Sequence, residues 1–328
     1  MSLLAFPPAD GLDSPDRPRT FHQVEPVVVN SSLQRHKRAV SFSPAPTPEP
    51  ADPSDSLSSR TPWLETASQI SAEEKLLVEW IFQQFNLNPD HYRARPIHRR
   101  IRACLRAVGA TTCTDAQLRL IERPQLLGAA LGALLIGTTS FFRDRAVFDD
   151  IAQLVLPEIR TRCSTLSVWS AGCSDGAELY SVAALLDGAG MLSSSRLLGT
   201  DCRSAAVERA RAGYFHPARL ADLPHELLAS VIEPSSHGPR IASGIRAAID
   251  WRQNDVMSCC DVAQWDLILC RNLLIYLQPH AVKQLLSRLR TALKPGGFLV
   301  LGTAEHPSGG CGFVRLAPCI YQREGNLA

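Results

Sequence analysis

The chain has 328 residues, of which 45% are hydrophobic and 20% are charged, and its formal net charge is +2. This length and apolar content allow one large domain or two smaller ones, each with a buried core. The near-neutral charge gives no global argument for nucleic acid or a membrane surface as a partner, and no apolar run is long enough to span a bilayer.

The ten cysteines and nine histidines are dispersed along the chain, and no CxxC pair occurs. Such spacing predicts no metal site, and it is typical of reduced thiols in a cytoplasmic protein. The first residues carry no basic stretch before an apolar one, so we expect no secretory signal there.

Residues 1–65 differ in composition from the rest of the chain, because eleven of the 23 prolines lie there. A segment of this kind buries too little apolar surface to offset the entropy of ordering it. We therefore predict a disordered, proline-rich tail.

A helical domain is expected over residues 66–138. Ser71 and Glu74 form a capping box that starts the first helix, and a second helix is predicted to start at Pro96. One face of that helix is apolar, and the opposite face carries Arg99, Arg102 and Arg106. Short helices near 114–122 and 125–136 complete the domain.

Residues 139–328 read as an α/β domain. A helical pattern over 145–160 precedes predicted strands at 166–170, 196–200, 247–252, 265–270 and 298–302, with helices at 176–188, 204–212 and 279–293 between them. This alternation predicts a doubly wound, mostly parallel sheet. Residues 313–322 suit one last strand, and about 213–246 break the alternation as a small insertion.

The stretch SAGCSDGAELYS, residues 170–181, falls where the first strand turns into a helix. Gly172 and Gly176 permit a sharp turn and a close approach of a ligand to the backbone, and Glu178 enters the next helix. Carboxylates repel phosphate, so the loop suits a cationic ligand with hydroxyls, such as S-adenosylmethionine. A plain tight turn accounts for the glycines equally well.

Two further strand ends carry acids. Asp201 ends the second strand, where a nucleoside-binding fold holds ribose hydroxyls; alternatively it caps the next helix, a role that Ser204 also suits. Asn254 and Asp255 follow the third strand, where they can bind an adenine edge or form an ordinary turn.

An apolar strand delivers Arg271, Asn272 and Tyr276 to the edge of the sheet, which favours a functional site over a structural polar cluster. Ahead of the sheet, Phe141 and Phe142 suggest a packing wedge between the two domains. Arg143 suits either a local salt bridge or a ligand carboxylate.

Together these stretches resemble the CheR family of chemoreceptor glutamate methyltransferases. The matching segments, in chain order over roughly residues 70–325, are TTSFFRD, SAGCSDGAELYS, GTDCRSAAVERARAGYF, QNDV, CRNLLIYL and LKPGGFLVLGTAEH. The resemblance implies a class I methyltransferase sheet after the helical domain, with S-adenosyl-L-methionine as cofactor and no metal.

Carried over motif by motif, the resemblance places the cofactor contacts on Thr139, Arg143, Glu178, Asp201, Asn254, Asp255, Arg271 and Asn272. It places Tyr276 beside the methyl-transfer cleft, with Arg271 or Tyr276 orienting the acceptor. The acceptor in that family is a glutamate on a receptor helix, and the stripe of Arg99, Arg102 and Arg106 suits an acidic helical partner. A solvated helix face is the alternative reading of the stripe.

The sequence departs from the family pattern at three places. Gly137 stands where the family has asparagine, Ala177 replaces a glutamate of the loop, and the insertion has no clear match to the family's peptide-docking strands. A small-molecule methyltransferase and a non-catalytic S-adenosylmethionine-binding signalling module are therefore alternatives to the glutamate methyltransferase.

Overall fold

The computed structural model describes residues 71–135, 137–258, 264–307 and 311–325. These residues belong to one compact unit, Thr66–Ala328. Residues 1–65, for which we predicted disorder, lie outside the described residues.

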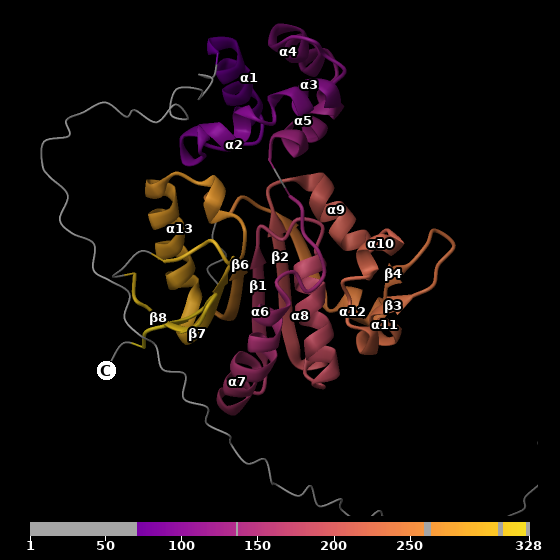
Figure 1. Ribbon diagram of the computed structural model, residues 1–328, viewed down its shortest axis with the longest axis vertical. Coiled ribbons are helices and arrows are strands. Elements are labelled where there is room, and N and C mark those ends of the chain that lie inside the picture. The colour runs from indigo at the N-terminus through magenta and orange to yellow at the C-terminus, as the bar shows by residue number, and fades with distance from the viewer. Residues whose placement is uncertain (1–70, 136, 259–263, 308–310, 326–328) are drawn as a thin grey trace, which may run out of the picture. The chain divides into compact units, whose positions relative to one another are not determined.

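Five short helices form the first part of the unit (Figure 1). They are α1 (Ala72–Gln83), α2 (Ala94–His98), α3 (Ile101–Ala107), α4 (Cys113–Glu122) and α5 (Leu127–Leu134), with 3-10 turns η2 (Pro89–His91) and η3 (Pro124–Leu126). The capping box at Ser71 is confirmed, because its hydroxyl accepts from the Glu74 N–H while the Glu74 carboxylate accepts from the Ser71 N–H.

The second predicted helix is two helices, and its start at Pro96 is wrong. The chain becomes helical at Ala94 and the helix is interrupted at Arg99 and Arg100, so α2 and α3 are separate helices, a break that periodicity alone does not reveal. The two faces nevertheless come out as predicted. The apolar side is buried at Ile97, Ile101, Cys104 and Val108, while Arg99, Arg102 and Arg106 are exposed.

A seven-stranded sheet in the order β5-β2-β1-β6-β7-β9-β8 forms the second part of the unit. Its strands are β1 (Leu166–Ala171), β2 (Ser195–Asp201), β5 (Ile249–Gln253), β6 (Trp265–Cys270), β7 (Leu293–Leu301), β8 (Phe313–Ala317) and β9 (Ile320–Arg323). The first five strands run parallel, and β9 pairs antiparallel with both β7 and β8, which confirms the doubly wound, mostly parallel class. The single strand expected over 313–322 is wrong, since the chain reverses there into the β8–β9 hairpin.

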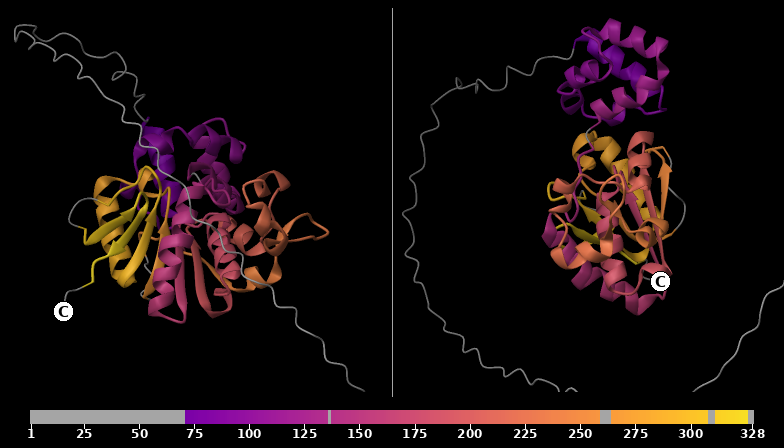
Figure 2. Two further views of the ribbon diagram at one scale, coloured as in Figure 1. Left: turned by 60° about the horizontal axis from the view of Figure 1, so that its bottom comes forward. Right: turned by 90° about the vertical axis from the view of Figure 1, so that its right-hand side faces the viewer.

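Helices cover both faces of the sheet (Figures 1 and 2). One apolar core joins Val168 and Leu269 of the sheet to α6 (Arg145–Asp150), α7 (Leu156–Arg162), α8 (Ala177–Gly188) and α9 (Ser204–Ala212). The other core joins Trp169 and Ile268 to α13 (Pro279–Ala292) and also contains the apolar side chains of the N-terminal helices. Neighbouring strand residues thus serve opposite cores, as the two-residue repeat of a strand requires.

The helical run over 145–160 is continuous but not uniform. A π-helical segment, η4 (Ile151–Val155), separates α6 from α7, which has Pro157 in its first turn. Because proline lacks a backbone N–H, it cannot donate to the carbonyl four residues earlier, and the helix widens just before it.

Residues 213–246 form the elements that interrupt the alternation. They comprise α10 (Pro217–Leu220), α11 (His225–Val231), α12 (Ser243–Ala247) and a two-residue antiparallel pair, β3 (Ile232–Glu233) with β4 (Arg240–Ile241). Two more 3-10 turns occur among the described residues, η5 (Leu192–Ser194) and η6 (Leu274–Tyr276).

Two local expectations are wrong. Ser204 does not cap α9, because Arg203 is the N-cap residue and Ser204 is the first helical residue. The rings of Phe141 and Phe142 do not form a wedge between the two parts, because both belong to the α8-side core, where Phe141 lies 4.7 Å from Phe215 between ring centroids.

Candidate active site

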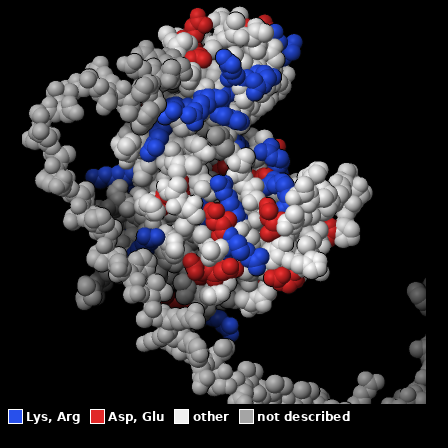
Figure 3. Space-filling view, in the orientation of Figure 1, with Lys and Arg blue, Asp and Glu red and all other residues white. Residues whose placement is uncertain are grey.

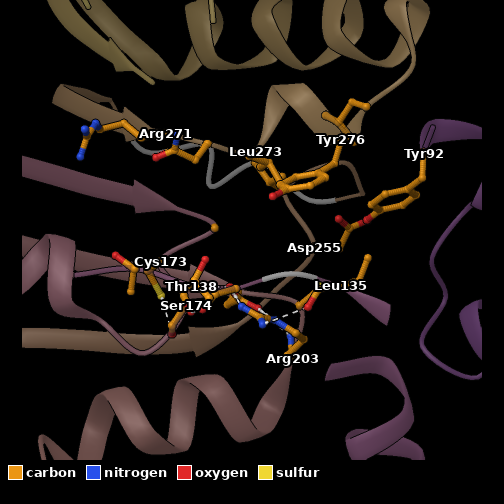
Figure 4. Close-up of a pocket in the computed structure, with 18 of the residues that line it drawn as sticks. Tyr92, Leu135, Thr138, Cys173, Ser174, Arg203, Asp255, Arg271, Leu273 and Tyr276 are labelled. Carbon is orange, nitrogen blue, oxygen red and sulfur yellow. Dashed lines mark hydrogen bonds and ion pairs between the residues drawn. The ribbon is translucent and has the colours of Figure 1, made fainter. Parts of the chain in front are cut away.

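A cavity of about 100 Å³ lies at the carboxyl ends of the parallel strands (Figure 4). It is lined by all nine residues that the sequence singled out: Thr139, Arg143, Glu178, Asp201, Asn254, Asp255, Arg271, Asn272 and Tyr276. They come from the ends of four strands and from the segment before α6. Such an edge is where open α/β sheets bind ligands.

The turn from β1 into α8 explains the glycines. Gly172, with φ of 80°, and Gly176, with φ of 88°, occupy the left-handed region that other residues disfavour. A side chain at Gly176 would lie 2.6 Å from Cη2 of Trp251, so the close packing of β5 against the loop also requires glycine. The loop is held by the carbonyl of Thr200, which accepts from the backbone N–H groups of Gly172 and Cys173 at 2.8 Å.

Glu178 enters the cavity from the first turn of α8 and is almost completely buried. Its carboxylate accepts from the Ser170 hydroxyl at 3.0 Å and from Nη1 of Arg271 at 3.2 Å. Burial raises the pKa of Glu178, although Arg271 and Ser170 act to lower it. The side chain therefore sits where a neighbouring positive charge is strongly favoured.

The guanidinium of Arg271 is bound to other groups of the protein. Its side chain is 1% exposed, and Nη2 donates to Oδ2 of Asp144 at 2.7 Å and to the carbonyl of Arg143 at 2.9 Å. Two carboxylates thus share this guanidinium, while its buried Nε has no partner within the described residues. The geometry favours a role in positioning Glu178 over the predicted contact with an acceptor.

Asp201 is held on every side. It accepts from the backbone N–H of Ser174 at 2.9 Å, from the backbone N–H of Arg203 at 3.0 Å, and from Nε and Nη2 of Arg203 at 2.9 and 3.0 Å. Its backbone carbonyl accepts from the Asn254 N–H at 2.9 Å, which ties the ends of β2 and β5 together.

Asp255 closes the turn after β5. Its carboxylate accepts from the Met257 N–H at 3.1 Å and the Ser258 hydroxyl at 2.7 Å, so the turn-forming role considered for it is present. The Asp255 side chain also lies near Tyr92 and Tyr276 in the cavity (Figure 4).

Before α6, Nη1 of Arg143 donates to the carbonyl of Thr138 at 3.1 Å, and the carbonyl of Thr139 accepts from Nη2 of Arg219 at 2.6 Å. Arg219 also pairs with Asp175 of the glycine loop. These contacts fasten the segment before α6 to the loop that follows β1.

Sequence reasoning missed Glu305. This acid follows β7 and is 3% exposed, and it accepts from the backbone N–H groups of Asn272 at 2.8 Å, Gly302 at 2.7 Å and Ile275 at 3.2 Å. It thereby fixes the loop after β6, where Asn272 has a left-handed φ of 58°. The available signal was an acid just beyond an apolar strand.

Tyr92 was also missed. It belongs to the segment between η2 and α2, lines the cavity beside Tyr276, and forms an antiparallel bridge with Leu277. Burial raises its pKa well above the ordinary value, so the phenol stays protonated. Nothing in its sequence neighbourhood signals this position, because the bridge joins segments 185 residues apart.

The residues fit S-adenosylmethionine. Glu178, Asp201 and Asp255 line one cavity beside the loop that contains Gly172 and Gly176, and their carboxylates are acceptors that suit hydroxyls and positive charge. Within the described residues no group of three or more His, Cys, Asp or Glu side chains is arranged to hold a metal ion. No helix in that part of the chain is long and apolar enough to cross a membrane.

The fold and site are those of an S-adenosylmethionine-dependent methyltransferase. The family model described as the CheR methyltransferase, SAM binding domain, matches residues 137–310, which is more than half of the chain. The chain therefore belongs to the CheR methyltransferase family, and S-adenosylmethionine is its cofactor.

Individual relatives agree with this family. An uncharacterized 104.1 kDa protein of Rhodobacter capsulatus is 32% identical over 239 residues, which are 70% of this chain and 25% of that protein. A chemotaxis protein methyltransferase of Vibrio parahaemolyticus is 30% identical over 189 residues, 55% of this chain and 69% of that protein. The chain thus spans a quarter of the first relative and about two thirds of the second.

Among solved structures, the glycopeptide N-methyltransferase MtfA complexed with S-adenosylmethionine aligns with 44% of this chain and 47% of its own. The sequence identity is 16% and the TM-score is 0.28.

Proposed function

We propose that the protein transfers a methyl group from S-adenosylmethionine to a glutamate side chain of a chemoreceptor-like protein. The observation that carries the proposal is the convergence of nine polar and charged residues, all expected from the family motifs, on one cavity. The acceptor class is supported by relatives that are chemotaxis protein methyltransferases.

For the cofactor, we propose that Glu178 faces the positively charged end and Asp201 the ribose. Asn254 and Asp255 would hold the adenine edge, while Thr139, Arg143 and Asn272 line the remaining wall. Arg271 acts through Glu178 and Asp144, and Tyr276 stands where an acceptor would enter beside the loop after β6.

The methyl transfer needs few catalytic groups from the protein. S-adenosylmethionine supplies an electrophilic methyl group, and a glutamate carboxylate is already ionised at neutral pH, so no general base is needed. The protein has to align the carboxylate and keep water out of the cavity, and such positioning accounts for a large share of the rate. The buried Glu178 and the fixed loop after β6 serve that purpose.

We propose that the stripe of Arg99, Arg102 and Arg106 docks an acidic helical segment of the partner. All three side chains are exposed, and the sequence holds no acidic residue between Asp90 and Asp115. Figure 3 shows basic side chains gathered over the N-terminal helices on this face. Complementary charge of this kind speeds encounter and sets orientation.

We also propose a domain organisation in which partner docking and methyl transfer belong to different segments of the chain. Residues 66–138 form the docking domain, residues 139–328 form the methyltransferase domain, and the insertion at about 213–246 belongs to the latter. The three exposed arginines lie in the first segment, and all nine predicted residues that line the cavity lie in the second, which supports the division.

The proposal is tested with S-adenosylmethionine labelled on its methyl group and a helical chemoreceptor peptide rich in glutamate. We expect label on the peptide that is released by mild base, as a methyl ester is, and none on a peptide with glutamine at those positions. Label that appears in a base-stable linkage, or no transfer to any glutamate peptide, would contradict the proposal.

The cofactor part is tested separately by calorimetry with S-adenosylhomocysteine, the reaction product. Asp201→Ala removes the strand-end carboxylate and is expected to weaken binding about tenfold or more, since hydrogen bonds to a charged group are among the stronger ones. Undiminished affinity in this variant would remove Asp201 from the proposed ribose site.

A further inference from the structure

The carboxylate of Asp201 has no acceptor position left for a ligand. A carboxylate offers about four lone-pair directions, and Asp201 receives four donors: the Ser174 N–H, and the N–H, Nε and Nη2 of Arg203. Both side chains are nearly buried, at 6% exposure for Asp201 and 10% for Arg203. The two form a forked ion pair inside the cavity wall.

The guanidinium of Arg203 lies in space that most residues at position 137 would fill. A Cβ built on Gly137 overlaps Nη1, Nη2 and Cζ of Arg203. The side chain reaches this place along the wall formed by Ser174 and Leu135, as Figure 4 shows. Glycine at 137 and arginine at 203 are therefore coupled, because a side chain at 137 would force the guanidinium to move from this position.

A ribose on Asp201 would conflict with this arrangement. Its two hydroxyls need acceptors, and a strand-end acid normally supplies them. Here two of the four acceptor directions are taken by Nε and Nη2 of Arg203. The cavity of about 100 Å³ is also smaller than the roughly 300–1,000 Å³ of typical small-molecule sites.

We propose that Arg203 determines the affinity for the cofactor by competing with the ribose for Asp201. When the nucleoside binds, Nε and Nη2 leave the carboxylate and the two ribose hydroxyls take their places. The backbone N–H groups of Ser174 and residue 203 remain and keep the carboxylate in position. This inference rests on the proposed ribose site, and it adds a residue that none of the family motifs assigns.

The competition predicts in which direction the affinity for the cofactor changes when Arg203 is altered. When the guanidinium is removed, the ribose no longer has to break a buried, forked ion pair in order to bind. The affinity for the cofactor therefore increases. If Arg203 instead held the nucleoside itself, its removal would weaken binding. A substitution at Gly137 that pushes the guanidinium aside, with every charge retained, has the same effect as removal.

The test measures S-adenosylhomocysteine binding by calorimetry with the full chain as wild type, Arg203→Ala, Gly137→Ala and the double variant. We expect the dissociation constant of each variant to fall about tenfold, the scale of a charge-assisted hydrogen bond. The double variant should match Arg203→Ala, because Gly137→Ala has no guanidinium left to displace.

The matched control is Arg252→Ala. Arg252 pairs with Asp250 two residues earlier, the same spacing as in the Asp201–Arg203 pair, but both side chains are more than half exposed and lie outside the cavity. Its dissociation constant should equal that of the wild type. Thermal melts of each variant identify any loss of folding, and Gly137→Ala tests the proposal even if Arg203→Ala does not fold.

Weaker or unchanged binding in both Arg203→Ala and Gly137→Ala overturns the proposal. Absence of binding in all variants would overturn it together with the cofactor site. The methyl acceptor plays no part in this experiment, so the result is independent of whether glutamate is the substrate.

Discussion

Glu305 is the acid on which the geometry of the loop after β6 depends. Oε2 accepts from the N–H groups of Asn272 and Gly302, and Oε1 accepts from that of Ile275. A side chain at Gly302 would lie 2.7 Å from the same Oε2, so this close contact requires glycine. One carboxylate thereby holds the backbone that carries Asn272 and Tyr276.

Glu305→Gln turns one acceptor into a donor that faces a backbone N–H. We expect the free energy of unfolding to fall by about 1–3 kcal/mol, the cost of a buried donor without a partner, and S-adenosylhomocysteine binding to weaken as well. Denaturant unfolding and calorimetry measure the two effects. The exposed Glu324→Gln is the control, and equal stability of the two variants would contradict the proposed role of Glu305.

Glu178 gives a prediction about pH. Its pKa is raised above the ordinary value of 4.5 by burial, so the folded chain binds this proton more tightly than the unfolded chain. The stability that the group contributes is therefore present below pH 4.5 and is lost as the pH rises through the folded-state pKa.

Because glutamine does not titrate, the unfolding free energy of the wild type minus that of Glu178→Gln should decrease as the pH rises above 4.5. Denaturant unfolding at a series of pH values measures this difference. A difference that grows with pH would mean that Arg271 outweighs burial and that the pKa is lowered instead.

At the scale of elements, periodicity predicted which residues share a face better than where each element ends. The apolar and basic faces of residues 97–108 were correct, although the helix is broken at Arg99. The hairpin of β8 and β9 was missed because the apolar content continues through the turn between Ala317 and Ile320, although Pro318 in that turn was a signal against one continuous strand. Breaks and reversals depend on packing that a local pattern does not contain.

The three arginines of the stripe are exposed along α2 and α3, so the proposed docking role is tested by changing them together. Reversal of Arg99, Arg102 and Arg106 to glutamate should raise the KM for an acidic helical substrate about tenfold at low salt, while the affinity for S-adenosylhomocysteine stays the same. The effect should shrink as salt rises and screens the exposed charges.

Reversal of three exposed basic residues elsewhere, Arg160, Arg209 and Lys283, changes the net charge equally and serves as the control. Methyl-transfer kinetics at two salt concentrations measure both variants. Equal KM values for the two triple variants would show that net charge, and not the stripe, attracts the substrate.

At the scale of the whole molecule, the sequence predicted which residues line the cavity better than the contacts that shape it. The nine predicted residues meet because parallel strands end at one edge of the sheet, which follows from their alternation with helices. Arg203, Glu305 and Tyr92 escaped prediction because their roles depend on distant backbone groups or, for Arg203, on the missing side chain at Gly137.

Cofactor binding should stabilise the compact unit as a whole, because the cavity joins β1, β2, β5 and β6 to the N-terminal segment at Tyr92. At a ligand concentration one hundred times the dissociation constant, the gain is about 2.7 kcal/mol. We expect S-adenosylhomocysteine to raise the melting temperature of the wild type in proportion to the logarithm of its concentration. If Asp201→Ala binds tenfold more weakly, the same concentration should stabilise it by only about 1.4 kcal/mol, and an equal shift in both would contradict the assigned site.

The most direct test of the account is a crystal structure of the protein with S-adenosylhomocysteine bound. The account predicts the ligand between Glu178 and Asn254, with its ribose hydroxyls on Asp201 and the guanidinium of Arg203 turned away from that carboxylate. A ligand bound outside the cavity formed by the strand ends would contradict it.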